Sequence, residues 1–147
     1  MSDQPLNVQF TTRRRVEFCE TDMAGIVHFA NYYRYMEQAE HAYFQSLGLS
    51  VMETMDDGTV VGWPRVSCQC RFLSPAFFED ELEIRVSVDR IGVKSLTLRF
   101  EFWREDVWIA SGRTKNVCCV LKRGETMRSI EIPSEYRDVI HESDRPA

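Results

Sequence analysis

The chain has 147 residues, and 18 Lys and Arg against 23 Asp and Glu give it a net charge of −5. This length predicts one domain over residues 1–147, with a core that forms without disulfides. The acidic balance excludes a general nucleic-acid-binding surface, which needs clustered positive charge. No apolar run approaches the ~18–20 residues of a membrane span, and the N-terminal sequence MSDQPLNVQF lacks the basic start and apolar stretch of a secretory signal.

The first predicted elements are a strand and a long helix. The strand is expected over Val8–Phe18. The helix is expected over Asn31–Leu47, because apolar residues recur there on one helix face, namely at Tyr32, Tyr35, Met36, Ala39, Tyr43 and Leu47. Asn31 is the expected N-cap, and Gly48 is the expected C-terminal stop.

The rest of the chain is predicted to be mostly strands. Apolar and polar residues alternate strictly in three runs, which predicts a sheet with one buried face: Arg65–Phe72, Glu81–Ile91 and Ser95–Phe102. The sequence Ile91-Gly92-Val93 predicts a tight hairpin between the last two runs. A longer strand is expected over Trp108–Leu121, where Gly112 marks a bulge or bend. Pro133 then opens a short helical tail, PSEYRDVI.

The order of these elements predicts an α+β fold. The helix has a broad apolar face that it cannot cover itself, and the antiparallel sheet has one apolar face. Wrapping the sheet around the helix buries both.

The five cysteines do not indicate a disulfide framework or a metal site. They stand at positions 19, 68, 70, 118 and 119, with no C-x-x-C spacing. We therefore interpret them as small buried hydrophobic residues in a reducing, cytoplasmic environment.

The segment between the first strand and the helix carries the candidate chemistry. It combines a carboxylate, Asp22, with a glycine and the start of the helix. Helix N-termini expose backbone N–H groups with partial positive charge, which can hold an oxyanion. Asp22 is placed to attack a carbonyl held there or to activate water against it. The alternative interpretation is a cap or a solvated loop residue.

The string FCETDMAGIVHFANYYRYMEQAEHAYFQSLGL resembles the signature of the 4-hydroxybenzoyl-CoA thioesterase family of hotdog-fold acyl-CoA thioesterases. That signature is an aromatic residue, D/E-x-D-x-x-G-[IV]-V, an aromatic cluster and N-Y-x-R-[YW]. The segments VSCQCRFLSPAFFEDELEI, RIGVKSLTLRFEF and RSIEIPSEYRDVI are also similar to the family, so the resemblance covers about residues 10 to 138. It implies a hotdog fold, an antiparallel sheet around one long central helix. It also implies hydrolysis of an acyl-CoA to a carboxylate and CoA, without a cofactor.

The resemblance also implies roles for residues of the motif. It places the catalytic aspartate at Asp22, as nucleophile through an acyl-enzyme anhydride or as general base. The backbone N–H that polarises the thioester carbonyl falls on Phe29. Gly25 permits close approach of the loop to the substrate, or simply a turn. His28 precedes Phe29 where many members have Tyr-His or Trp-Tyr; it could orient Asp22, contact water or bond to a neighbouring subunit.

Coenzyme A carries phosphates, and the family places cations near them. Lys94 and Arg128 fall on such positions, with Arg90, Lys122 and Arg123 nearby. The alternative for each is a solvated surface residue. The resemblance further implies a homodimer or homotetramer with the acyl pocket between subunits.

The sequence also offers other candidate residues and activities. Glu37 and Glu40 are reserve candidates for the catalytic carboxylate, although Glu37 is more simply paired with His41 one turn on. Five aromatic residues could line the pocket or a subunit contact, and a place in the core or an interface is the favoured interpretation for each: Trp63, Trp103, Trp108, Phe77 and Phe78. Two rival functions are a non-catalytic acyl-CoA-binding protein and a hotdog dehydratase, which would pair His28 with a carboxylate.

Overall fold

The computed structural model describes residues 6–146, so part of the N-terminal sequence assessed for a secretory signal lies outside the described residues. The elements, in chain order, are β1 (Phe10–Arg15), η1 (Phe18–Glu20), α1 (Phe29–Ser46), β2 (Met52–Thr54), β3 (Val60–Gly62), β4 (Arg65–Phe72), β5 (Glu81–Ile91), β6 (Ser95–Arg104), β7 (Val107–Val117), β8 (Cys119–Leu121), β9 (Arg128–Ser129) and α2 (Ser134–Arg137). Within that part of the chain, no helix is long and apolar enough to cross a membrane.

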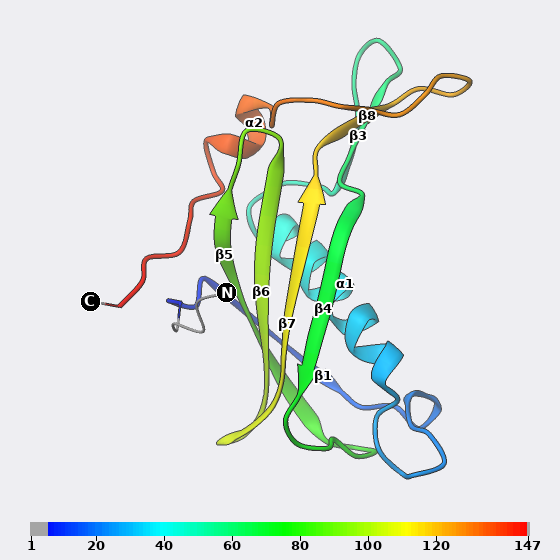
Figure 1. Cartoon of the computed structure of the whole chain (residues 1–147), viewed down its shortest axis with the longest axis vertical. Helices are drawn as coiled ribbons and strands as arrows, with labels where there is room; N and C mark the ends of the chain where they lie inside the picture. Colours follow the sequence, from blue (N-terminus) through cyan, green and yellow to red (C-terminus); the bar gives the residue numbers. More distant parts are fainter. Residues whose placement is uncertain (1–5, 147) are drawn as a thin grey trace.

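One large antiparallel sheet forms the frame of the molecule. Its strand order is β1-β5-β6-β7-β4, and α1 lies against one of its faces (Figure 1). A second sheet, in the order β2-β3-β8-β9, projects beyond one end of the large sheet. The predicted wrapping of a sheet around the long helix is therefore confirmed, whereas the second sheet was not predicted.

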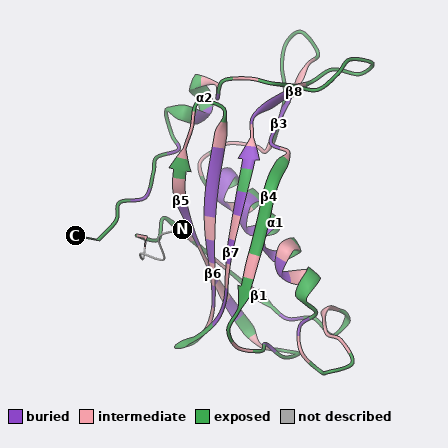
Figure 2. Ribbon diagram, viewed as in Figure 1, coloured by how far each residue is buried: buried purple, intermediate pink, exposed green. Residues whose placement is uncertain are grey.

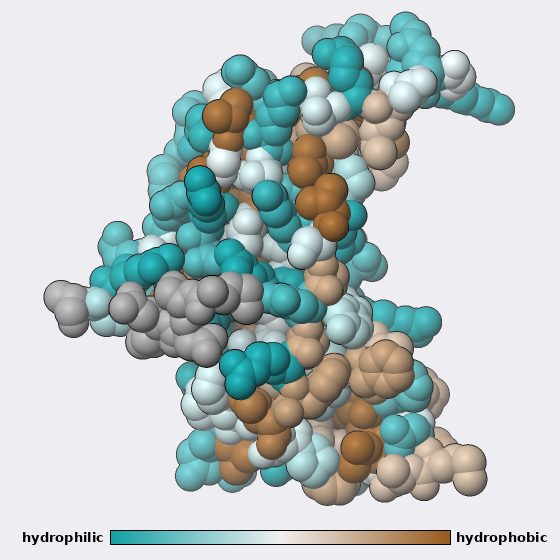
Figure 3. All heavy atoms as spheres, viewed as in Figure 1, coloured by the Kyte–Doolittle hydropathy of each residue, from teal (hydrophilic) through white to brown (hydrophobic). Residues whose placement is uncertain are grey.

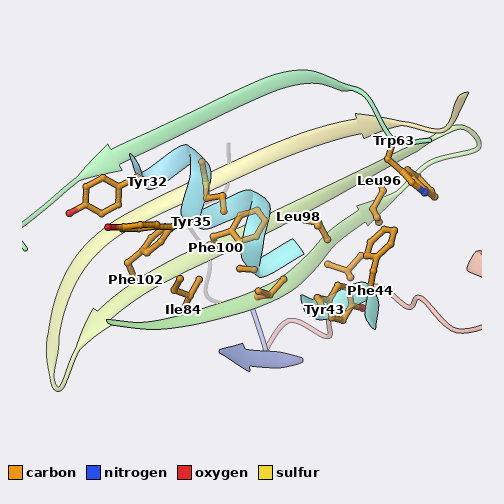
Figure 4. Packing of buried hydrophobic residues seen from close by; sticks show 14 of the residues in the cluster. Tyr32, Tyr35, Tyr43, Phe44, Trp63, Ile84, Leu96, Leu98, Phe100 and Phe102 are labelled. Carbon is orange, nitrogen blue, oxygen red and sulfur yellow. The ribbon is translucent and has the colours of Figure 1, made fainter. Parts of the chain in front are cut away.

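The core lies between α1 and the inner face of the large sheet. The inward side chains of β5 and β6 are at most 1 % exposed, as the alternation predicted: Leu82, Ile84, Val86, Val88, Leu96, Leu98, Phe100 and Phe102. They meet the buried face of α1, where Tyr35, Met36 and Phe44 are fully buried. Figure 4 shows Tyr32, Tyr35 and Phe102 gathered at one end of this core, and Phe44 and Trp63 at the other.

Gly112 has a packing role, and the predicted bulge at this position is wrong. It lies in the regular part of β7, paired with Phe100 on one side and Cys70 on the other. A Cβ atom there would overlap the sulfur of the buried Met36. The absence of a side chain therefore allows the helix to approach the sheet. The irregularity between β6 and β7 lies instead at Phe102 and Trp103.

The strand predicted over Trp108–Leu121 is two strands in different sheets. β7 ends at Val117 and β8 begins at Cys119, so the chain leaves the large sheet at Cys118. The Cys118 N–H donates to Lys94 O at 2.7 Å, which ties this crossing to the β5–β6 hairpin. All five cysteines are free thiols. Cys118 and Cys119 are buried as expected, whereas Cys19 and Cys68 are exposed and Cys70 is partly exposed, so the interpretation of all five as buried residues is wrong.

The helix begins earlier than its apolar pattern predicts. Its first residue is Phe29, and the N-cap is His28 rather than Asn31. The His28 Nδ1 atom accepts from the Ala30 N–H at 3.1 Å. The helix ends at Ser46, and Gly48, with φ of +73°, takes the left-handed conformation expected after a helix.

β4 differs from the other long strands because its residues are mostly exposed (Figure 2). Its alternation predicted one buried face, but β4 is an edge of the sheet. Val66 is 60 % exposed and Phe72 is 48 % exposed. Hydrophobic side chains also gather on the side of the molecule where β4 lies (Figure 3). This edge is thus left open by the fold of a single chain.

Candidate active site

A tight turn presents the Asp22 carboxylate ahead of α1. The Gly25 N–H donates to Asp22 O at 2.9 Å, and the Asp22 N–H donates to Ile26 O at 2.9 Å. Gly25 has φ of +80° and nothing within 4 Å of where a Cβ would stand. The glycine is therefore required by the turn. The Asp22 Oδ1 atom accepts from the Ala24 N–H at 2.8 Å, which fixes the orientation of the carboxylate.

The first turn of α1 supplies a backbone donor. His28 occupies two of the first N–H groups: its Nδ1 accepts from Ala30, and its carbonyl oxygen accepts from Asn31 at 2.9 Å. For the Phe29 N–H, no residue between 6 and 146 provides an acceptor. The free N–H thus stands where the helix dipole favours negative charge.

Contacts with the β4–β5 connection hold this region in place. The Val27 N–H donates to Ala76 O at 2.8 Å, and Ile26 forms a bridge with Phe77. Arg104 in β6 fixes the connection from the other side, through Pro75 O at 3.1 Å.

Asp22 and Phe29 line the same cavity, whose volume is about 590 Å³. Its walls come from the Asp22 turn, the start of α1 and the end of β4: Asp22, Ile26, Val27, Phe29, Tyr32, Phe72, Leu73, Ser74 and Pro75. Most of these side chains are apolar. Burial raises the pKa of Tyr32 to about 12, so its hydroxyl stays neutral at physiological pH. The cavity therefore suits an apolar group attached to a reactive carbonyl.

The predicted phosphate-binding cations lie at the other end of the sheet. Lys94 follows β5, Arg90 is near the end of β5, and Arg128 begins β9. The cavity is at the Phe72 end of β4, whereas the Lys94 carbonyl binds Cys118 beyond the opposite end. Strands of this length separate the two ends by roughly 25 Å. A single chain therefore does not bring these cations to Asp22.

The reserve carboxylates on α1 are also away from the cavity. Glu37 pairs with Arg65 at 3.2 Å, so its expected pairing with His41 is wrong. Glu40 is only 1 % exposed; it pairs with Arg65 at 2.8 Å and accepts from Asn116 Nδ2 at 2.6 Å. Burial raises the pKa of Glu40, against the opposing effect of Arg65. These contacts join the helix to β4 and β7.

The aromatic residues singled out from the sequence do not line the cavity. Trp63 is buried against Phe44, with ring centroids 5.8 Å apart. Trp103 and Trp108 stack on each other at 5.7 Å. Phe77 and Phe78 are each 45 % exposed near the loop.

Sequence reasoning missed the cavity wall supplied by the end of β4. Phe72, Leu73, Ser74 and Pro75 are some fifty residues from Asp22 in the chain, so no local motif contains them. The sequence signal for this wall is Ser74-Pro75, which ends the alternation of β4 and predicts a loop there.

The chain is similar to proteins of known family. Residues 16–140 match the sequence model of the thioesterase-like superfamily. A 4-hydroxybenzoyl-CoA thioesterase of Pseudomonas sp. (strain CBS-3) is 33 % identical over 131 residues, which cover 86 % of this chain and 93 % of that protein. A 1,4-dihydroxy-2-naphthoyl-CoA hydrolase of Nostoc punctiforme is 34 % identical over 113 residues, covering 76 % of this chain and 74 % of that protein.

A solved structure extends the similarity to the fold. It is a 4-hydroxybenzoyl-CoA thioesterase in which an aspartate is replaced by asparagine, complexed with 4-hydroxybenzoyl CoA. It superposes on this chain with a TM-score of 0.75 at 27 % identity, covering 88 % of this chain and 96 % of that one. The predicted hotdog fold is thereby confirmed.

Proposed function

This chain belongs to the thioesterase-like superfamily and is a thioester hydrolase, and we propose that it hydrolyses an acyl-CoA by means of Asp22 and the Phe29 N–H. The observation that carries this proposal is the meeting of an anchored carboxylate and an unoccupied helix N–H at one apolar cavity. Each feature alone is common at helix starts, but together they supply a base or nucleophile beside an oxyanion donor.

The chemistry begins with the thioester oxygen bound to the Phe29 N–H. In the nucleophilic route, an Asp22 oxygen attacks the carbonyl carbon, the C–S bond breaks and CoA leaves as a thiolate that takes up a proton. Water then hydrolyses the anhydride and restores Asp22. In the general-base route, Asp22 takes a proton from the water that attacks the carbonyl carbon, the same C–S bond breaks, and the proton passes to the departing CoA thiolate, which restores Asp22. His28 assists both routes, because it occupies the neighbouring N–H groups and leaves that of Phe29 for the substrate.

We further propose an aromatic acyl group as the substrate class. Phe29, Tyr32 and Phe72 contribute aromatic surface to the cavity, and aromatic rings pack favourably edge-to-face or offset against such surfaces. The similar proteins from Pseudomonas and Nostoc are named for hydroxybenzoyl and dihydroxynaphthoyl thioesters.

The test is free-thiol release from a panel of aromatic and aliphatic acyl-CoA compounds by wild type and by Asp22→Asn. We expect Asp22→Asn to lower kcat by about 10²–10⁴-fold. Asp57→Asn is the matched control, because Asp57 also accepts a backbone N–H two residues on, from Thr59 at 2.9 Å, but does not line the cavity. Full activity of Asp22→Asn, or ligand binding by wild type without thiol release, would refute the proposal.

The proposed assembly is a homodimer formed through β4. An open edge strand invites pairing with another strand, and a two-fold axis places two copies of β4 antiparallel. The Arg65 end of one copy then lies beside the Phe72 end of the other. This arrangement brings the partner's Lys94, Arg90 and Arg128 toward the cavity mouth, where they are proposed to bind the phosphates of CoA.

The assembly is tested by light scattering of a β4 variant. Cys68 is exposed near the middle of β4. Cys68→Lys places charges close together across the two-fold axis, so we expect it to shift the protein to monomer, whereas the matched Cys68→Ser should leave the dimer intact. A monomeric wild type, or a Cys68→Lys dimer of unchanged stability, would contradict the β4 interface.

A further inference from the structure

Arg14 occupies an unusual place in the fold. Along β1 the inward positions are Phe10, Thr12 and Arg14, which are partly covered, while the intervening residues are exposed. An arginine thus faces the helix where an apolar residue would pack. Its guanidinium lies over the Tyr35 ring at 4.0 Å from the centroid. It also donates to Gln38 Oε1, one turn further along α1.

The same guanidinium holds Glu20, the residue two before Asp22. Arg14 Nη2 donates to Glu20 Oε2 at 2.8 Å, and both side chains are largely buried, at 20 % and 15 % exposure. The second carboxylate oxygen, Oε1, accepts from the Glu17 N–H at 2.8 Å. Both oxygens of Glu20 are therefore engaged by groups that only donate.

The main chain of Glu20 reaches the helix start. Its carbonyl oxygen accepts from the His28 N–H at 2.9 Å and from Asn31 Nδ2 at 2.7 Å. These two residues flank the turn that exposes the Phe29 N–H. Glu20 thus joins η1, which leads into the Asp22 turn, to the first turn of α1, and its ion pair with Arg14 ties both to β1.

We propose that Glu20, held by Arg14, is a positioning residue that sets the distance between the Asp22 carboxylate and the Phe29 N–H. The proposal rests on the proposed function for its catalytic consequence. A partly buried ion pair is weak evidence for stability, since apolar replacements often serve as well. Such a contact can still fix the relative position of two groups that act on the substrate. A displacement of about 1 Å between such groups can lower a rate about 10²-fold.

The primary variant is Glu20→Gln, which keeps the shape of the side chain. A glutamine amide presents a donor to either Arg14 or the Glu17 N–H, so one of the two contacts is lost. We expect kcat to fall about tenfold to 10²-fold while KM stays within about twofold. Arg14→Met should have the same effect, and the double variant should be no slower than either single variant, because both act on one contact.

Arg13→Met is the matched control. Arg13 is the adjacent residue of β1, is 67 % exposed, and pairs with Glu83 at 3.1 Å on the outer face. We expect it to leave kcat and KM unchanged. Thermal unfolding of all variants separates loss of folded protein from loss of rate, and an Arg14→Lys variant should recover part of the lost kcat by restoring the charge beside Glu20.

Hydrogen exchange gives a readout that does not depend on turnover. In Glu20→Gln the His28 amide, which is bonded to Glu20 O, should exchange faster, whereas the Val27 amide, bonded to Ala76 O, should not change. Unchanged kcat in Glu20→Gln and Arg14→Met of an active wild type would overturn the positioning role. If wild type releases no thiol from any acyl-CoA, the proposed function fails, and unchanged His28 exchange then overturns the positioning role independently.

Discussion

The contact between Gly112 and Met36 predicts that Gly112→Ala destabilises the protein when Met36 is present and not when Met36 is replaced by alanine. In Gly112→Ala the new Cβ would lie well inside 3.0 Å of Met36 Sδ and 3.4 Å from both Cγ and Cε. Non-bonded heavy atoms prefer about 3.5–4.0 Å, so the sulfur must move by more than about 1 Å. Met36 is fully buried, which leaves the thioether no open space to enter.

The expected cost follows from overpacking of a core. Inserting a methyl group into a well-packed site costs about 1–3 kcal/mol. For a chain of this size, each kcal/mol lowers Tm by about 2–4 °C, so a central value of about 2 kcal/mol corresponds to about 4–8 °C. Urea unfolding should show a lower midpoint at unchanged slope, because the change acts on the native state.

The matched background is Met36→Ala, which removes the obstructing sulfur. Met36→Ala alone should cost about 2–5 kcal/mol through the cavity it leaves. Adding Gly112→Ala to it should then be neutral or stabilising by about 0.4–1 kcal/mol, because alanine reduces the freedom of the unfolded chain. An equal cost of Gly112→Ala in both backgrounds would refute the reasoning, since the cost would then not come from Met36.

Four further predictions concern the helix cap, the buried Arg65–Glu40 pair and the thiols. His28→Ala should lower stability by about 0.5–2 kcal/mol, and His28→Asn should recover most of the loss, as measured by thermal unfolding, because asparagine is also a good N-cap. Arg65→Met should cost about 3–5 kcal/mol at pH 8. The cost should shrink as the pH is lowered toward 4.5, because burial raises the pKa of Glu40 above that ordinary value and the unpaired carboxylate can bind a proton. An equal cost at both ends of this pH range would contradict the prediction. Because the native state holds the Glu40 proton more tightly than the unfolded state, the free energy of unfolding should fall as pH rises from 4.5 through the raised pKa of Glu40. Urea titrations at several pH values should show a weaker pH dependence for Glu40→Gln. Iodoacetamide at pH 8 should modify the exposed Cys19 and spare Cys118, whose pKa burial raises to about 11, in peptide mapping of the native protein.

The alternation of β5 and β6 made the core predictable. Two-residue periodicity assigns every inward position at once, so Leu82 and Phe100 were identified as core residues without a three-dimensional model. The small sheet lacked such a signal, because β2, β3 and β8 are three residues long and β9 is two. A pattern over two or three residues cannot distinguish a strand from a loop.

The site was predictable only where its residues are close in sequence. Asp22 and Phe29 fall within one motif, and both line the cavity. His28 was not recognised as the cap, because its Nδ1 replaces the shorter polar side chains usual at that position. The role of the Glu20 carbonyl depends on main-chain geometry, which no side-chain pattern records.

The pairing of β1 with β5 determines when β1 can fold during synthesis of the chain. Phe10 lies opposite Val86, although β1 precedes β5 by more than sixty residues in the chain. During translation at about 5–20 residues per second, β1 waits several seconds for its neighbour to emerge. The Asp22 turn waits similarly for Ala76, its hydrogen-bonding partner through Val27. The proposed site therefore forms late in synthesis, because its contact with Ala76 can be made only after that residue has left the ribosome.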